Sequence, residues 1–258
     1  MNNPTSNSPN PERELPYGGG EALDGHSSSD PAAASERQRE LIVGVSHDLR
    51  GRLSSLQLVA TALADGILEP DLERQYLKQM PVHVGALVAL VEDLFELSRL
   101  EAGDPRSAMH PVDVHALVAQ TVDGMQMEAE MEGVSLTVEV PPGTTLASGS
   151  AGKLERVLRN LIENALHHTP RRGTVDVLVR ATAASIEVDV TDTGSGIDDI
   201  DRDQVFEPFV RGTEASPTGG TGLGLTVCRA IVEAHGGRIW LAEREDGTRV
   251  RFSLPQSD

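Results

Sequence analysis

Two long amphipathic segments joined by a short turn constrain the fold of this chain most strongly. In the first, residues 35–64, apolar side chains recur at steps of three and four residues, which is the period of a helix with one buried face. The second covers residues 71–101, and Gly66 and Pro70 mark the turn between them. Pro81 lies inside the second segment, where it is expected to kink the helix. Because such a hairpin has too little core of its own, we expect a homodimer that forms a four-helix bundle.

The composition limits the class of protein. The chain has 258 residues, enough for one large or two modest domains. Its net charge of -18 argues against a nucleic-acid partner or an anionic membrane surface, which both need clustered Lys and Arg. The sequence shows no signal peptide and no apolar run long enough for a membrane span, and its single cysteine, Cys228, cannot form an internal disulfide. We therefore expect a cytoplasmic protein.

The hydrophobic pattern divides the chain into three parts. Residues 1–34 are rich in Asn, Ser, Pro and Gly and are predicted to be a disordered tail. Residues 35–104 contain the hairpin. Residues 108–256 alternate between helices and strands, which predicts an α/β sandwich with a mostly antiparallel sheet covered by helices on one face. The expected helices of this domain cover residues 111–132, 150–168 and 223–235, and the expected strands cover 134–140, 174–180, 185–192, 238–243 and 249–254.

His47 lies on the first helix, in the stretch Ser46-His-Asp-Leu-Arg50, and off the apolar stripe. At about 100° per residue it points roughly opposite the buried face. An exposed histidine is largely neutral near pH 7, so it has a free ring nitrogen that can act as a nucleophile. Gly44 and Gly51, one helical turn before and after, leave room for a bulky group to approach. Most such histidines are ordinary surface residues, so the case for His47 depends on motifs elsewhere in the chain.

A polar cluster lies on the predicted helix 150–168. Asn160, Asn164 and His167 share one face, away from the apolar stripe. Two carboxamide oxygens one turn apart can bind a hard cation without adding negative charge beside phosphates. A solvated helix surface would show the same pattern, and both interpretations are open at this point.

Two glycine-rich loops have the composition of a nucleotide site. A predicted strand ends at Asp192, and Gly194 and Gly196 follow; a carboxylate beside two glycines suits a hydrogen bond to an adenine amino group. A tight turn capped by the aspartate would explain that pattern equally well. The loop 219–224 precedes the apolar helix 223–235, so its N–H groups are expected to bind phosphate at the positive helix end. The loop matches neither a P-loop nor a dinucleotide fingerprint.

An aromatic pair lies between these loops. Phe206 and Phe209 stand out in a chain with only 3% aromatic residues. They either fill the core or anchor a mobile lid over the nucleotide. In the second case Arg211 is placed to contact phosphate.

The motifs occur in a fixed order along the chain: His47 in the hairpin, Asn160-Leu-Ile-Glu-Asn164, Asp192-Thr-Gly-Ser-Gly196, Phe206-Glu-Pro-Phe209 and Gly220-Thr-Gly-Leu-Gly224. In sequence and spacing they resemble the H, N, G1, F and G2 boxes of bacterial two-component sensor histidine kinases. The resemblance covers about residues 36–256. It implies a HisKA-type dimerisation and phosphoacceptor hairpin, followed by an ATP-binding domain of the Bergerat (GHKL) type.

The resemblance also implies a role for each motif. His47 would attack the γ-phosphate of ATP, with Asp48 as general base, and the phosphoryl group would pass to an aspartate of a response regulator receiver domain. Asn164 would ligate Mg²⁺, and Asp192 would recognise adenine. The further residues that it implies in ATP binding are Asn160, His167, Gly194, Gly196, Arg211, Gly220, Thr221, Gly222, Leu223 and Gly224. The input signal would arrive through the tail, the bundle or a separate sensory protein.

The chain departs from the family pattern around its H box. Asp48 replaces the usual glutamate and keeps its charge. Gly51 occupies the Thr or Asn position that orients water for dephosphorylating the partner, which leaves the phosphatase activity open. Arg52 replaces a proline that helps the helix to bend, and we expect the weak helix former Gly51 to supply that flexibility. An alternative function is a catalytically weak dimeric scaffold, or a pseudokinase that binds a regulator.

Overall fold

A computed structural model gives the fold of the chain. It describes residues 31–102, 109–143, 145–182, 185–198, 202, 204–210, 222–244 and 246–257. The predicted tail therefore lies outside the described residues as far as residue 30. So do the predicted site residues Arg211, Gly220 and Thr221. At His47 and Asp48 the backbone is helical, but the two side chains are outside what the structure describes.

The hairpin consists of α1 (Pro31–Ala64) and α2 (Pro70–Ala102). α1 begins four residues earlier than the sequence pattern predicts. Pro81 lies inside α2, as predicted. Asp71 and Glu73 in the first turn of α2 stabilise its positive end. Within the described part of the chain, no helix is long and apolar enough to cross a bilayer.

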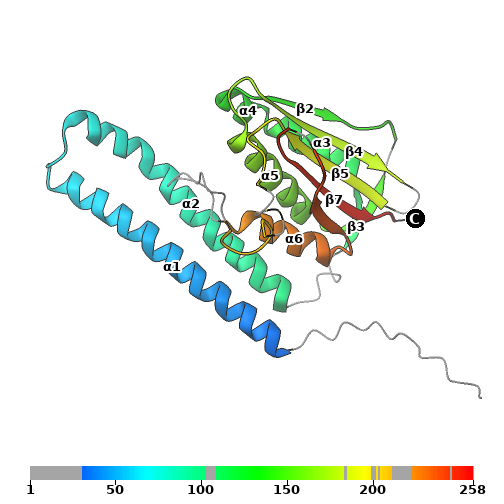
Figure 1. The fold of residues 1–258 in the computed structure, drawn as a ribbon, viewed down its shortest axis with the longest axis horizontal. Coiled ribbons are helices and arrows are strands. Elements are labelled where there is room, and N and C mark those ends of the chain that lie inside the picture. The colour runs from blue at the N-terminus through cyan, green and yellow to red at the C-terminus, as the bar shows by residue number, and fades with distance from the viewer. Residues whose placement is uncertain are drawn as a thin grey trace, which may run out of the picture. The chain divides into compact units, whose positions relative to one another are not determined.

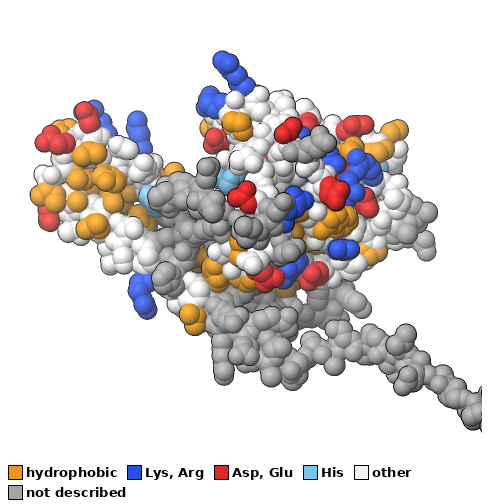
Figure 2. Space-filling view, viewed as in Figure 1, with side chains coloured by type: hydrophobic (Ala, Val, Ile, Leu, Met, Phe, Trp, Pro, Cys, Tyr) orange, Lys and Arg blue, Asp and Glu red, His pale blue; other side chains and the backbone are white. Residues whose placement is uncertain are grey.

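The buried face of the hairpin differs in part from the predicted stripe. In the second segment of the sequence, apolar residues that include Val91 recur near a 3.5-residue step. In the structure Leu90 and Leu97 are buried on α2, whereas Val91 is exposed. On α1, Val45 is buried and Leu53 is exposed. The remaining large apolar side chains exposed on the hairpin are Val43, Leu58, Ile67, Leu72, Leu77, Val82, Val84, Val88 and Phe95. Hydrophobic side chains accordingly gather on its surface (Figure 2).

The rest of the chain forms the predicted α/β sandwich. Its elements are β1 (His110–Asp113), α3 (Val114–Gly124), α4 (Gln126–Glu132), β2 (Ser135–Glu139), β3 (Leu146–Gly149), α5 (Ala151–His168), β4 (Thr174–Ala181), β5 (Ser185–Asp192), α6 (Gly224–Ala234), β6 (Arg238–Leu241) and β7 (Arg249–Pro255). The main sheet has the strand order β2-β4-β5-β7-β6. β2 runs parallel to β4, and the other neighbouring strands are antiparallel. α3, α5 and α6 pack on one face of this sheet (Figure 1).

The single helix predicted over residues 111–132 is wrong. Its first residues form β1, which pairs with β3 in a separate two-stranded sheet. The helix starts only after Asp113, whose carboxylate accepts a hydrogen bond from Ala116 N at 3.1 Å as an N-cap. It then breaks at the buried Met125, where the backbone has φ -103° and ψ 2°. Neither short strand was predicted, because β1 and β3 are defined by pairing with each other.

His235 joins the two helices on which the nucleotide motifs lie. The side chain is buried, and its Nδ1 lies 2.7 Å from Ile231 O while its Nε2 lies 3.1 Å from Ser150 N. The amide of Ser150 can only donate, so the neutral ring has its proton on Nδ1 and accepts at Nε2. Ser150 is the N-cap of α5 but makes no side-chain capping bond, so His235 connects the start of α5 to the end of α6.

We predict a pH-dependent contribution of His235 to stability. Burial lowers the pKa of the ring from its ordinary value of 6.5; the Ile231 carbonyl opposes this, and Lys153 adds to it. A lowered folded-state pKa means that the neutral ring stabilises the fold fully above pH 6.5, and that this contribution is lost as the pH falls through the folded-state pKa. His235→Ala should cost about 1–3 kcal/mol of unfolding free energy at pH 7.5.

Denaturant unfolding of wild type and His235→Ala at pH 7.5, 6.5 and 5.5 measures the effect. The difference between the two proteins should shrink as the solution becomes more acidic. A difference that stays constant over this range would mean that His235 contributes by packing alone.

Candidate functional site

Asp192 is the best-defined polar group of the candidate site. It ends β5 and is buried, and its Oδ1 accepts hydrogen bonds from Gly194 N at 2.8 Å and Thr248 N at 3.1 Å. Two backbone amides therefore fix the orientation of the carboxylate. Its Oδ2 makes no hydrogen bond within the described part of the chain, so this oxygen can accept from a ligand amino group.

Glycines allow three segments to meet around Asp192. A β-carbon at Gly194 would overlap the carbonyl oxygen of His168, at the end of α5. A β-carbon at Gly247 would overlap the carbonyl oxygen of Asp192, and Gly247 also has a φ of +75°. The end of α5, the helix that carries the N box, is thus in direct contact with the G1 box. Sequence reasoning missed Gly247 and Thr248, because the only local signal was an ordinary turn before β7.

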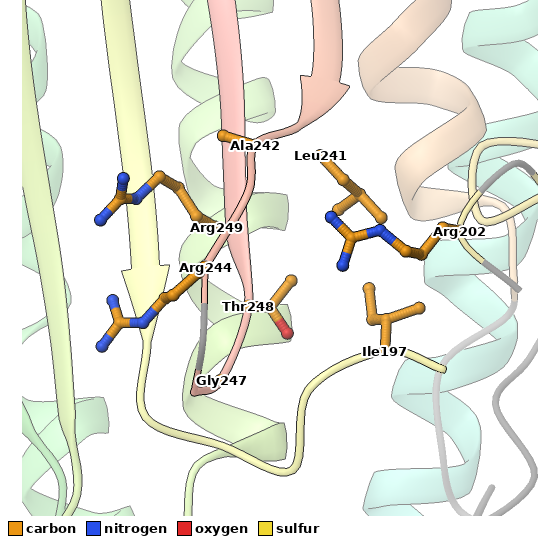
Figure 3. Close-up of a pocket in the computed structure, with 8 residues that line it drawn as sticks. All are labelled: Ile197, Arg202, Leu241, Ala242, Arg244, Gly247, Thr248 and Arg249. Carbon is orange, nitrogen blue, oxygen red and sulfur yellow. The ribbon is translucent and has the colours of Figure 1, made fainter. Parts of the chain in front are cut away.

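A small pocket adjoins Asp192 on the side of the turn between β6 and β7. The residues that line it are Ile197, Arg202, Leu241, Ala242, Arg244, Gly247, Thr248 and Arg249. It shares Gly247 and Thr248 with the surroundings of Asp192. The side chains of Arg244 and Arg249 extend away from Arg202 (Figure 3), so the arginines do not converge on one anion. This pocket extends the surroundings of Asp192 without forming a phosphate site.

α5 presents the predicted asparagines. Its apolar stripe is buried as predicted, with Leu154, Val157, Leu158, Leu161, Ile162 and Ala165 in the core. Asn160 and Asn164 are half-buried, and His167 is exposed. The Nδ2 of Asn160 lies 3.5 Å from Gly224 O, at the limit of a hydrogen bond, so Asn160 connects α5 to the first residue of α6. The N and G2 boxes are therefore also neighbours.

The F box contacts the described end of the G2 loop. Phe209 N donates a hydrogen bond to Gly222 O at 2.9 Å, and a β-carbon at Gly222 would lie 2.9 Å from Phe209 Cα. Phe206 is buried in the core, whereas Phe209 is half-buried. Leu223 is fully buried, so its side chain belongs to the core. The structure thus brings parts of the N, G1, F and G2 boxes together.

Sequence models of two protein families match the chain. The His Kinase A (phospho-acceptor) domain matches residues 37–103. The histidine kinase-, DNA gyrase B- and HSP90-like ATPase matches residues 149–258. The first match covers most of the hairpin, and the second covers the segments that meet at Asp192.

Several characterised proteins are similar over most of this chain. The sensor-like histidine kinase SenX3 of Mycolicibacterium smegmatis is 31% identical over 232 residues, which cover 88% of this chain and 60% of SenX3. The sensor histidine kinase WalK of Bacillus subtilis is 31% identical over 229 residues, 86% of this chain and 37% of WalK. The chain thus spans little more than half the length of the SenX3 relatives that it matches.

Solved structures share the fold. The Acinetobacter baumannii histidine kinase AdeS matches with a TM-score of 0.67 and 24% identity, over 82% of this chain and 98% of AdeS. The histidine kinase ThkA, in a complex with the response regulator protein TrrA, matches with a TM-score of 0.72 and 19% identity, over 88% of this chain and 64% of ThkA. From the two family matches, the similar kinases and the contacts among the boxes, we conclude that this chain belongs to the two-component sensor histidine kinases.

Proposed function

We propose that the chain transfers the γ-phosphoryl group of ATP to His47 and then to an aspartate of a response regulator. The observation that carries this proposal is the carboxylate of Asp192. Two backbone amides hold one of its oxygens, and the other makes no hydrogen bond to the residues that the structure describes. The carboxylate lies where the end of α5 meets the G1 box. The same chain has a helical hairpin that matches the phosphoacceptor family. The function thus combines a nucleotide site with a residue that can receive phosphate.

The described groups of the site match the parts of ATP. Oδ2 of Asp192 would accept a hydrogen bond from the adenine amino group. The amides of Gly222 and Gly224 at the start of α6 would bind phosphate oxygens, aided by the positive end of the helix. Asn164, half-buried on the polar face of α5, would ligate Mg²⁺ through its neutral carboxamide oxygen. Bound Mg²⁺ would neutralise charge on the phosphates.

The transfer step follows from the chemistry of His47. A neutral ring nitrogen of His47 would form a bond to the γ-phosphorus while the bond to the bridging oxygen breaks, so that ADP leaves. Asp48 would take the proton from the other ring nitrogen. A receiver aspartate would then displace the phosphoryl group from His47. The structure of ThkA bound to the response regulator TrrA gives a related kinase with such a partner.

A second copy of the chain is the expected partner of the hairpin. Val84, Val88, Val91 and Phe95 recur at helical steps along α2, and between 39% and 66% of each residue is exposed. A contiguous apolar stripe of this kind marks an interface rather than a solvated surface. The match to the phosphoacceptor domain supports pairing of two hairpins into a four-helix bundle.

The alternative is a scaffold that binds a regulator without transferring phosphate. The H box motivates it, because Gly51 and Arg52 replace two family residues. Such a scaffold would retain dimerisation and could retain nucleotide binding, so only phosphorylation separates the two functions.

We predict that the wild-type chain incorporates label from γ-labelled ATP into an acid-labile linkage. His47→Gln should lose roughly 95% or more of that label, so that only the assay background remains, because glutamine has no nucleophilic ring nitrogen. His110→Gln, a change at an exposed histidine of β1, is the matched control and should retain the label. A wild-type protein without label would favour the scaffold.

Asp192→Asn should weaken binding of a non-hydrolysable ATP analogue by about 10-fold to 100-fold. The asparagine can keep its oxygen on the two backbone amides, and its NH₂ group would then face the adenine amino group, donor against donor. Isothermal titration calorimetry measures the loss. Asp123→Asn, on an exposed part of α3, should bind as the wild type does, and an equal loss in both variants would contradict adenine recognition by Asp192.

Val88→Glu should raise the dissociation constant of the homodimer by about 100-fold or more, because the interface would bury an unpaired charge. Ala89→Glu adds the same group at the next exposed position, about 100° around the helix, and should change the dissociation constant of the homodimer little. Sedimentation equilibrium measures both. Equal effects would mean that the stripe is not the interface.

A further inference from the structure

Phe209 lies directly against the helix that carries His47. A β-carbon at Gly44 would lie 2.6 Å from Phe209 Cδ2 and 2.8 Å from Phe209 Cζ, and it would overlap Cε2. The ring therefore occupies the space that any larger side chain at residue 44 would need. Gly44 was expected to leave room for a bulky group beside His47. In the structure the ring of Phe209, from the same chain, occupies that room.

The backbone of Phe209 is held in an unusual conformation. Its φ is +64°, in the left-handed region that bulky residues rarely adopt. Its amide donates to Gly222 O at 2.9 Å, and the backbones of the two residues are in contact. Such strain persists only where the surroundings over-determine it, and it clusters at functional sites. The ring of Phe209 and the G2 glycine are thus coupled through the backbone.

The contact lies beside the phosphoacceptor position. Gly44 precedes His47 by three residues, and residues three apart are neighbours on a helix surface, with β-carbons about 5–6 Å apart. The ring therefore holds the turn formed by residues 204–210, and Gly222 behind it, next to the helix face that carries His47.

A second contact joins the ATP-binding domain to the hairpin. Arg156 on α5 pairs with Asp93 on α2 at 2.8 Å, and Lys153 lies 2.9 Å from Glu96. Both carboxylates are buried. The contact of Lys153 with Glu96 is an ion pair, but its angles do not meet the geometry of a hydrogen bond. These pairs hold α5 against α2, and Phe209 contacts α1, so the ATP-binding domain touches both helices of the hairpin.

We propose that Gly44 is a socket for the ring of Phe209, and that this contact positions Gly222, at the end of the G2 loop, for transfer to His47. Phe209 is a positioning residue in this arrangement, because it acts through Gly222. The inference rests on the proposed kinase function. Helix formation does not explain the glycine, since alanine is the better helix former at an interior position such as this one. Its advantage is the space that it leaves for the ring.

The test uses the full chain and the variant Gly44→Ala. The added methyl group displaces the ring by about 1 Å or more, and displacements of that size can lower a rate by about 100-fold, so the rate of autophosphorylation should fall by about tenfold or more. The affinity for an ATP analogue should fall much less than the rate, by about twofold at most, since Asp192 and the two amides that hold it are unchanged. Gly85→Ala is the matched control: it also replaces a helical glycine of the hairpin, nothing lies within 4 Å of its β-carbon, and it should react as the wild type does.

A double-mutant cycle isolates the contact. Phe209→Ala should also slow the reaction, and Gly44→Ala should cause no further loss in that background, because the ring it obstructs is gone. A labelled wild type with an unaffected Gly44→Ala, or the same fold-loss in both backgrounds, would overturn the socket alone. A wild type that incorporates no label would overturn the proposed function and this inference with it.

Discussion

The candidate site depends on close backbone contact around Asp192. The end of α5, the end of β5 and the turn before β7 approach so closely that only glycine fits at residues 194 and 247. These approaches bring the amides of Gly194 and Thr248 onto one oxygen of Asp192. A carboxylate fixed in this way needs no rearrangement to present its second oxygen, so little entropy is lost when a ligand binds. The orientation of the Asp192 carboxylate is thus set by backbone amides.

Local patterns predicted the elements that have a strong periodicity of their own. The apolar stripe expected on helix 150–168 lies in the core, and β5 covers the predicted residues 185–192. α2 was also predicted, including Pro81 in its interior. In each case the chain itself carries the signal, because a buried face repeats at the period of the element.

Features that depend on distant segments were not predictable. β1 and β3 are short strands that exist through their mutual pairing, and the residues of β1 were assigned mostly to the predicted helix. Gly247 and Thr248 lie more than fifty residues from Asp192, and nothing near them marks a site. The burial of the carboxylates Asp93 and Glu96 was not predictable either, because acidic residues on a helix normally lie on its solvated surface.

Buried charge in this acidic chain is compensated locally. Asp189, 2% exposed on β5, accepts from Arg180 at 2.6 Å and from Arg251 at 2.9 Å. Its hydrogen bond to Arg251 is the main cause of the raised pKa of that guanidinium. Breaking such a pair would leave an uncompensated charge, which costs far more than an exposed pair contributes.

The two glycines that flank His47 have different surroundings, which separates their roles. Gly44 is packed against Phe209, so its lack of a side chain serves a contact. Gly51 has no atom within 4 Å of a β-carbon position, so steric room does not explain it. Its carbonyl accepts a hydrogen bond from Ser55 Oγ at 3.1 Å, a side-chain bond of the kind that bends helices. With Arg52 in place of the family proline, a weak helix former beside such a bond is suited to supply the bend. On this argument Gly44 makes room for Phe209 of the ATP-binding domain, and Gly51 is suited to bending the helix.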